Sequence, residues 1–362
     1  MYPNNWEVVY AADNLKRIHH FSSGPEYAEI SGRVTINDLP SELIVRISKY
    51  IPDSIISGKD FPRYNSRSLL QLALCSRRFY RLVEPVIYER FHHGAETSTK
   101  GFLMFLVRIL ARPDLGRCVR VFCVDGTKAP GLGIIMEDDH DEMCHIYMEF
   151  CHGHYDSDFD VSYFTVEDLK AVRKKIAEAS TTTLECYEWA AGVEKGDLNA
   201  MIALILTLAP NLQVLDIDTW TRPDSVPPIL TRMLAQAGQL QRERQLGQPF
   251  ALWRLKKVVV RYHHASAMDE IIHHLISLLT IPSVEILSAI HEDAVEDYYC
   301  SPETDVNEGD LEAALQGINL GLANMKELSF SFMPMSPNTL FRLWCCYPNL
   351  KKFSYRDNLG DD

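Results

Sequence analysis

Two apolar patterns run along the chain, and the first occupies residues 39–88. Near its start, apolar residues recur at the spacing of one helical face: Leu43, Ile44, Ile47 and Ile51. Pro40 suits the first position of this helix, because a donor there has no intrahelical partner, and Pro52 ends it. A second apolar stretch, residues 69–75, continues into a segment that ends near Tyr88. The pattern therefore predicts a helical module of about fifty residues.

The small size of this module limits how much apolar surface it can bury by itself. Surplus apolar surface on a short module is typical of a docking surface. The alternative is an ordinary helical hairpin whose leucines form its own core. At this point the apolar pattern is compatible with both a docking role and a purely structural one.

The second pattern is apolar-x-x-apolar-x-apolar, which favours a short buried strand. Its first positions are Cys118, Leu212, Leu255, Val284, Met325 and Leu350. Apolar helix candidates precede several of these strands, at residues 102–110, 201–208, 271–279 and 340–344. A unit of helix, turn and short strand cannot bury its own faces, so neighbouring units must stack. We therefore expect a repeat array in residues 100–358, with an unrelated α/β domain of similar element order as the alternative.

Three segments interrupt the expected array. Residues 125–161 are acidic and contain several histidines, and residues 291–312 are acidic without any Lys or Arg. Residues 221–249 hold a polar Gln/Arg helix, at 230–246, that lacks a clean apolar stripe. Long insertions in repeat proteins map to loops, which commonly carry binding function. Residues 291–312 are compatible with a surface for a basic partner and with a merely solvated loop.

Three short motifs mark the first module. Residues 39–43 read Leu-Pro-x-Glu-Leu, residues 76–79 read Ser-Arg-x-Phe, and residues 85–88 read Pro-x-x-Tyr. Together they resemble the F-box, the helical module by which substrate receptors dock on the Skp-type adaptor of cullin–RING ubiquitin ligases. The family usually has Cys where Ser76 stands, and Pro-x-x-Tyr is found in many fungal members. Residues 53–68 separate the first two helices, where the family commonly has only a few residues.

The second pattern resembles the degenerate leucine-rich repeats that follow F-boxes in many receptors, although the asparagine of that repeat is absent from most units. The two resemblances imply an α+β fold, with an N-terminal three-helix F-box followed by an irregular α/β leucine-rich-repeat-like solenoid. They divide the chain into a flexible segment at 1–35, the F-box at 36–91 and the repeat domain at 100–358.

The resemblance implies a non-catalytic function, that of a substrate-recognition subunit of a Skp–cullin–F-box type ubiquitin ligase. The implied partners are the Skp-type adaptor, cullin through that adaptor, and a client protein whose identity the sequence does not reveal. The alternative is an F-box scaffold or regulatory protein that acts without ubiquitination. The residues implied to contact the adaptor are Leu39, Pro40, Leu43, Ile44, Ile47, Leu69, Leu72, Phe79 and Pro85.

Net charge and cysteine content limit the classes of partner and the cellular compartment that we expect. A net charge of −13 argues against nucleic acid or an anionic membrane as the main partner, because both reward clustered Lys and Arg. Residues 1–30 contain no apolar signal-peptide core, and no apolar run approaches the roughly twenty residues of a membrane helix. The nine cysteines form no regular framework. We therefore expect a soluble cytoplasmic or nuclear protein with free thiols.

Metal-binding residue types gather in residues 144–167, but their spacing does not suit a metal. Residues 156–167 imitate a calcium loop, yet Val161 occupies the place where that loop needs Gly. Thr165 and Asp168 instead suit a helix capping box. The Cys and His residues of 144–154 lack the paired spacing of a zinc site. We expect no metal and no cofactor, and keep a metal-dependent enzyme as a third hypothesis that elemental analysis tests.

Other chemistry has little support in the sequence. Gly131-Leu132-Gly133 lacks the third glycine of a dinucleotide fingerprint, and the chain contains no phosphate loop and no nucleophile elbow. A basic pocket for a phosphorylated client is a further candidate; its residues would be Arg254, Lys256, Lys257 and Arg261. The alternative is that these lysines solvate an exposed strand edge.

Overall fold

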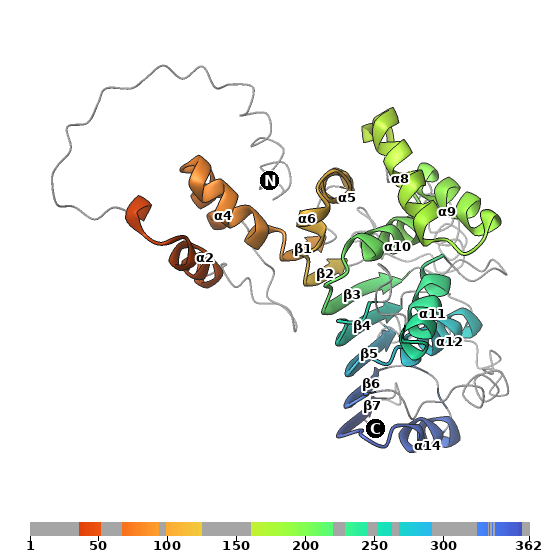
Figure 1. Ribbon diagram of the computed structural model, residues 1–362. Helices are drawn as coiled ribbons and strands as arrows, with labels where there is room; N and C mark the ends of the chain where they lie inside the picture. Colours follow the sequence, from red (N-terminus) through yellow and green to blue (C-terminus); the bar gives the residue numbers. More distant parts are fainter. Residues whose placement is uncertain are drawn as a thin grey trace, which may run out of the picture.

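The computed structural model describes residues 36–51, 67–93, 99–124, 161–219, 229–244, 252–262, 268–291, 324–331 and 337–356, together with Met333 and Met335. These residues form a mixed helical and stranded fold with a seven-stranded parallel sheet (Figure 1). The predicted segment 1–35, the metal candidates of 144–160 and the acidic stretch 292–312 lie outside the described residues.

The strands follow one another across the sheet in chain order, β1-β2-β3-β4-β5-β6-β7, and every neighbouring pair is parallel. Their bounds are β1 (Arg90–His93), β2 (Val121–Val124), β3 (Val214–Thr219), β4 (Lys257–Tyr262), β5 (Ile286–His291), β6 (Glu327–Ser331) and β7 (Lys352–Arg356). Parallel neighbours need a crossover that returns the chain to the start of the next strand. Helices supply it in several units, so strands and helices alternate along the chain.

Several helices of the C-terminal part lie on one side of this sheet. Figure 1 shows α10, α11, α12 and α14 together on the same side of the strands. The helices are η1 (Ile36–Asp38), α2 (Ser41–Tyr50), α3 (Arg67–Leu74), α4 (Arg77–Ile87), α5 (Thr99–Ala111), α6 (Pro113–Gly116), η2 (Val161–Tyr163), α8 (Val166–Ala179), α9 (Thr183–Lys195), α10 (Leu198–Leu208), α11 (Ile229–Arg242), α12 (Met268–Leu279) and α14 (Pro337–Cys346). The core lies between this helical layer and the covered face of the sheet.

The strand register brings the recurring apolar positions into rows. One row of paired residues consists of Phe91, Phe122, Leu215, Val258, Leu287, Leu328 and Phe353. All of these except Phe353 are buried. Because side chains alternate between the two faces of a strand, a single register puts every member of this row on the core side. The predicted alternation is therefore confirmed for β3, β4, β5, β6 and β7.

The predicted first unit of the apolar pattern starts one residue before the unit in the structure. The pattern starting at Cys118 would put Val121 and Cys123 in the core rows, but the register places Phe122 and Val124 there. Val119, not Cys118, is the fully buried anchor of this unit. A shift of one residue exchanges the two faces of a strand, and four apolar residues in succession give no period to fix it. The sequence pattern also missed β1, whose four residues are too few to show an alternation.

The same backbone turn precedes several strands. The N–H of Leu212 donates to the Ala209 carbonyl oxygen at 3.0 Å, and that of Leu255 donates to Leu252 at 2.8 Å. Equivalent bonds start at Val284 and Leu350. In the first of these turns, the Asn211 side chain also donates to the Arg117 carbonyl oxygen of the preceding unit at 2.8 Å. Repetition of one turn fixes the same strand entry in successive units.

Two helices between the strands test further predictions. The capping box at the start of α8 is confirmed, because Thr165 Oγ1 accepts from the Asp168 N–H and Asp168 Oδ2 accepts from the Thr165 N–H. The prediction that α11 lacks an apolar stripe is wrong, since it buries Leu230, Met233, Leu234 and Ala237 against its neighbours. The stripe is not evident in the sequence because small and polar residues contribute to the buried face. Gln241 is buried there, and its side-chain amide donates to the Ser283 hydroxyl and accepts from the Ser283 N–H.

Candidate docking surface on the first helical module

The helix α2 starts from the Leu-Pro pair. The Pro40 carbonyl oxygen accepts the N–H groups of Leu43 and Ile44 at 3.0 and 3.2 Å, so Pro40 occupies the N-cap, one place before the expected first helical position. Its side chain can make no capping hydrogen bond, and Arg78 of α4 stabilises this entry instead. Nη2 of Arg78 donates to the Leu39 carbonyl oxygen at 2.5 Å.

One side of α2 is covered by the chain itself. Ile44 is 2% exposed, and Ser48 is fully buried with its hydroxyl donating to the Val45 carbonyl oxygen at 2.8 Å. The helix packs against α4, which also packs against α3. Since the buried Ser48 hydroxyl is satisfied within its own helix, it imposes no unpaired polar group on this contact. α2 is thus seated on α4 through one face.

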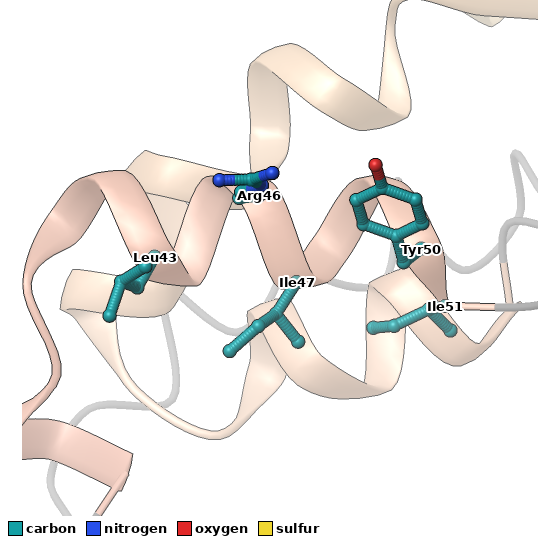
Figure 2. A pocket seen from close by; sticks show the side chains of 5 residues that line it. All are labelled: Leu43, Arg46, Ile47, Tyr50 and Ile51. Carbon is teal, nitrogen blue, oxygen red and sulfur yellow. The ribbon is translucent and has the colours of Figure 1, made fainter.

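The other side of α2 exposes apolar side chains. Leu43 and Ile47 are each 44% exposed, and Tyr50 is 74% exposed. Together with Arg46 and Ile51 they form an open, largely apolar surface. Figure 2 shows Leu43, Ile47 and Ile51 along one side of the helix, with Arg46 and Tyr50 beside them. We call these five residues the α2 ridge.

The helix α4 is fixed at both ends. At its start, Ser76 is the N-cap and its Oγ accepts the Phe79 N–H at 3.1 Å, which satisfies one of the free donors of the first turn. Further along, the buried carboxylate of Glu84 accepts from Tyr80 Oη at 2.8 Å and from Arg108 Nη2 of α5 at 3.0 Å. The helix that supports α2 is therefore tied to the first helix of the C-terminal part.

Aromatic rings continue this connection into the sheet. Tyr88, directly after α4, stacks on Phe105 of α5 with ring centroids 5.9 Å apart. Phe91 of β1 stacks on Phe105 at 4.1 Å and on Phe122 of β2 at 5.3 Å. Aromatic pairs at these distances add to the free energy of burial. The module and the start of the sheet consequently share one core.

The predicted adaptor contacts fall into three groups. Pro40, Leu43 and Ile47 are exposed, and Leu39, Leu72 and Pro85 are partly buried. Ile44, Leu69 and Phe79 are buried in the core of the chain itself, so we correct their expected role from surface contacts to interior support. Arg46 and Tyr50 of the α2 ridge are not among the predicted contacts, although the helical spacing from Leu43 and Ile47 places them on the neighbouring stripe.

Two of the four cations of the candidate basic pocket around β4, Arg261 and Lys256, lie close to carboxylates of the chain. The Arg261 guanidinium lies 2.6 Å from Asp216 and 3.1 Å from Asp218, which are both buried. Burial opposes the charge of Arg261, but these two carboxylates outweigh that effect and raise its pKa. Lys256 lies 3.5 Å from Glu285. These cations already face carboxylates of the chain, which disfavours a pocket for a phosphorylated client there.

Within the described part of the chain, no group of three or more His, Cys, Asp and Glu residues is arranged to hold a metal ion. None of the helices in that part is both long and apolar enough to cross a membrane. Comparisons with protein-family models, with curated proteins and with solved structures gave no match to this chain.

Proposed function

We propose that the chain is the substrate-recognition subunit of a Skp–cullin–F-box type ubiquitin ligase, and that the α2 ridge docks the Skp-type adaptor. The observation that carries the proposal is the exposure of Leu43 and Ile47 beside Tyr50, on a helix whose opposite face is seated on α4. The ridge belongs to the segment that carries the Leu-Pro-x-Glu-Leu motif. A fixed helix with one bare apolar face suits a partner that supplies the missing helical cover.

The α2 ridge supplies a part of the binding free energy that this role needs. Full burial of a Leu or Ile side chain contributes about 1.5–3 kcal/mol, and Leu43 and Ile47 are already about half buried. Covering them contributes on the order of 1 kcal/mol each. Tyr50 adds a larger exposed surface, and its phenol remains at the rim where it can meet water or a polar partner. The rigid support from α4 reduces the ordering cost that association otherwise carries.

For the C-terminal part, we propose a degenerate leucine-rich-repeat array that holds the client. Its support is the chain-order parallel sheet, the helices on one side and the turn that recurs before the strands. In this proposal the chain performs no covalent chemistry. It raises the effective concentration of the client near the ubiquitin-charged enzyme, and the joint between α4 and α5 sets the distance between the two bound proteins.

Binding of purified full-length chain to a Skp-type adaptor tests the proposal. We expect Leu43→Glu with Ile47→Glu to abolish binding, because both carboxylates would be placed on the ridge. The matched control is Leu184→Glu with Tyr187→Glu, which changes two exposed apolar residues of α9 and should leave adaptor binding unchanged. If the unaltered chain does not bind the adaptor, or if both double variants bind equally well, the proposed docking site is wrong.

A further inference from the structure

The C-terminal end of the sheet is a strand edge. β7 pairs with β6 on one side and is the last strand in the order of the described sheet, as Figure 1 shows at the end of the stack. Lys352, Ser354 and Arg356 are exposed along it, with Phe353 and Tyr355 partly buried between them. An edge strand presents backbone donors and acceptors that another extended segment can pair with.

The hydrogen bonds of the preceding strands define which groups face this edge. The N–H of Glu327 donates to the Glu285 carbonyl oxygen at 3.0 Å, and the N–H of Lys352 donates to the Lys326 carbonyl oxygen at 3.0 Å. In a parallel ladder, alternate residues direct their backbone groups to opposite neighbours. Lys352 therefore faces β6, and the N–H and carbonyl of Phe353 face outward. A segment added in the same register would donate an N–H to the Phe353 carbonyl oxygen.

The side chains at this edge differ between the two faces of the sheet. On the core side, Phe353 lies 6.4 Å from Phe330 and 5.8 Å from Trp344 of α14, measured between ring centroids. Trp344 is 59% exposed and Phe341 of the same helix is 68% exposed, so the core layer ends in an aromatic surface. On the opposite face, Lys352 and Arg356 carry positive charge, and the register places Glu327 of β6 beside Lys352.

The charges of Lys352 and Arg356 favour one kind of strand over another as the partner of the β7 edge. If β7 of a second copy paired antiparallel about Ser354, Lys352 would lie opposite Arg356, and like charges directly opposite one another destabilise a sheet. A parallel copy in register would place Lys352 beside Lys352. An acidic segment instead complements both positions, and apolar residues between its acids continue the core rows of Phe353 and Tyr355.

We propose that the β7 edge binds an extended segment of a partner protein as an additional parallel strand, with the pattern acidic–apolar–any–apolar–acidic. The two acids face Lys352 and Arg356, the two apolar residues pack beside Phe353 and Tyr355 next to Trp344, and the central residue faces Ser354. Identifying this partner as the client rests on the proposed function, whereas the strand addition itself does not depend on adaptor docking.

A labelled peptide, Gly-Asp-Val-Thr-Val-Asp-Gly, tests the proposal by fluorescence anisotropy with the full-length chain. We expect saturable binding and several-fold weaker binding to Lys352→Glu, because that change replaces a favourable cross-strand pair by a repulsive one. A peptide with Lys in place of both Asp should show the reverse preference. Lys170→Glu, which changes an exposed lysine of α8, should bind the acidic peptide like the unaltered chain.

Backbone methylation of the peptide tests the parallel register. Methylation of the Thr nitrogen removes the donor to Phe353 and should weaken binding about threefold to tenfold. Methylation of the second Val nitrogen, which faces away from β7 in this register, should change binding much less. The proposal is wrong if the acidic peptide does not bind, or if it binds Lys352→Glu as tightly as the unaltered chain. It is also wrong if only methylation of the second Val nitrogen weakens binding. Adaptor binding of Lys352→Glu should be unchanged, which separates failure at this edge from failure at the α2 ridge.

Discussion

Arg78 and Leu39 join two distant parts of the first helical module, since Nη2 of Arg78 lies 2.5 Å from the Leu39 carbonyl oxygen. The same nitrogen lies 3.5 Å from the Ser41 hydroxyl. Because Pro40 offers no side-chain cap, the guanidinium of α4 sets the direction in which α2 leaves the Leu-Pro pair. This relationship connects the sequence motif to the position of the α2 ridge.

We predict that Arg78→Ala lowers the free energy of unfolding by about 1–2 kcal/mol and weakens adaptor binding, because the carbonyl of Leu39 loses its charged donor. Urea denaturation and adaptor titration measure the two effects. Arg77→Ala is the control, since Arg77 is exposed on the same turn and should change stability by less than about 0.5 kcal/mol. Equal effects of the two variants would contradict this role for Arg78.

Glu84→Gln should lower the free energy of unfolding more than Glu194→Gln, the same substitution in an exposed ion pair. Glu84 is buried with Arg108 at 3.0 Å and Arg112 at 3.5 Å. The substitution leaves the Arg108 guanidinium without its carboxylate, whereas Arg112 keeps Asp114 at 2.6 Å. We expect a loss of about 2–3 kcal/mol in the free energy of unfolding. Glu194→Gln breaks the exposed pair with Arg173 and should cost at most about 1 kcal/mol. Similar losses in chemical denaturation would refute a coupling role for Glu84.

Ser76→Ala should lower the free energy of unfolding by about 1 kcal/mol, because the Phe79 N–H loses its acceptor at the start of α4. Ser76→Asp retains an acceptor oxygen and adds a charge that suits a helix N-terminus, so it should recover most of the stability. Thermal unfolding of the three proteins provides the comparison. If the aspartate variant is as unstable as the alanine variant, the cap does not stabilise α4.

Buried His274 should make stability depend on pH. Burial lowers its pKa from 6.5 to about 4, and its Nδ1 lies 3.1 Å from the Tyr262 hydroxyl. As the pH falls from about 6.5 to about 4, the unfolded chain binds a proton that the folded chain does not. The free energy of unfolding should therefore decrease in that window by up to about 1.4 kcal/mol per pH unit, and the contribution of His274 is complete above it.

The double variant His274→Phe with Tyr262→Phe removes this titration without leaving the Tyr262 hydroxyl opposite an apolar ring. Its unfolding free energy should fall less steeply between pH 6.5 and 4 than that of the unaltered chain. Burial and the neighbouring His92 also lower the pKa of His93 to about 4. His93 therefore still contributes to the pH dependence of the unfolding free energy in the double variant. His273→Gln changes the exposed neighbour and should preserve the full dependence. An unchanged slope in the double variant would exclude His274 as its source.

Local signals determined several elements before any tertiary contact was known. The capping box of Thr165 and Asp168 marked the start of α8, because both partners lie within one turn. Core alternation in β3 and β6 was visible because polar or small residues separate Leu215 from Ile217 and Leu328 from Phe330. In β2 four apolar residues follow one another, so the face of each side chain depended on the register with β3.

For the α2 ridge, the sequence by itself determined an apolar helix after the Leu-Pro pair, because helical spacing places Leu43, Ile44 and Ile47 around one side. Only the tertiary structure decided that Ile44 is interior and that Leu43 and Ile47 remain exposed. These side chains span an arc wider than the contact with α4, and burial depends on where a neighbouring helix lies across that arc. The spacing of apolar residues gives the direction of each side chain around the helix axis, whereas its exposed fraction depends on where the neighbouring helix lies.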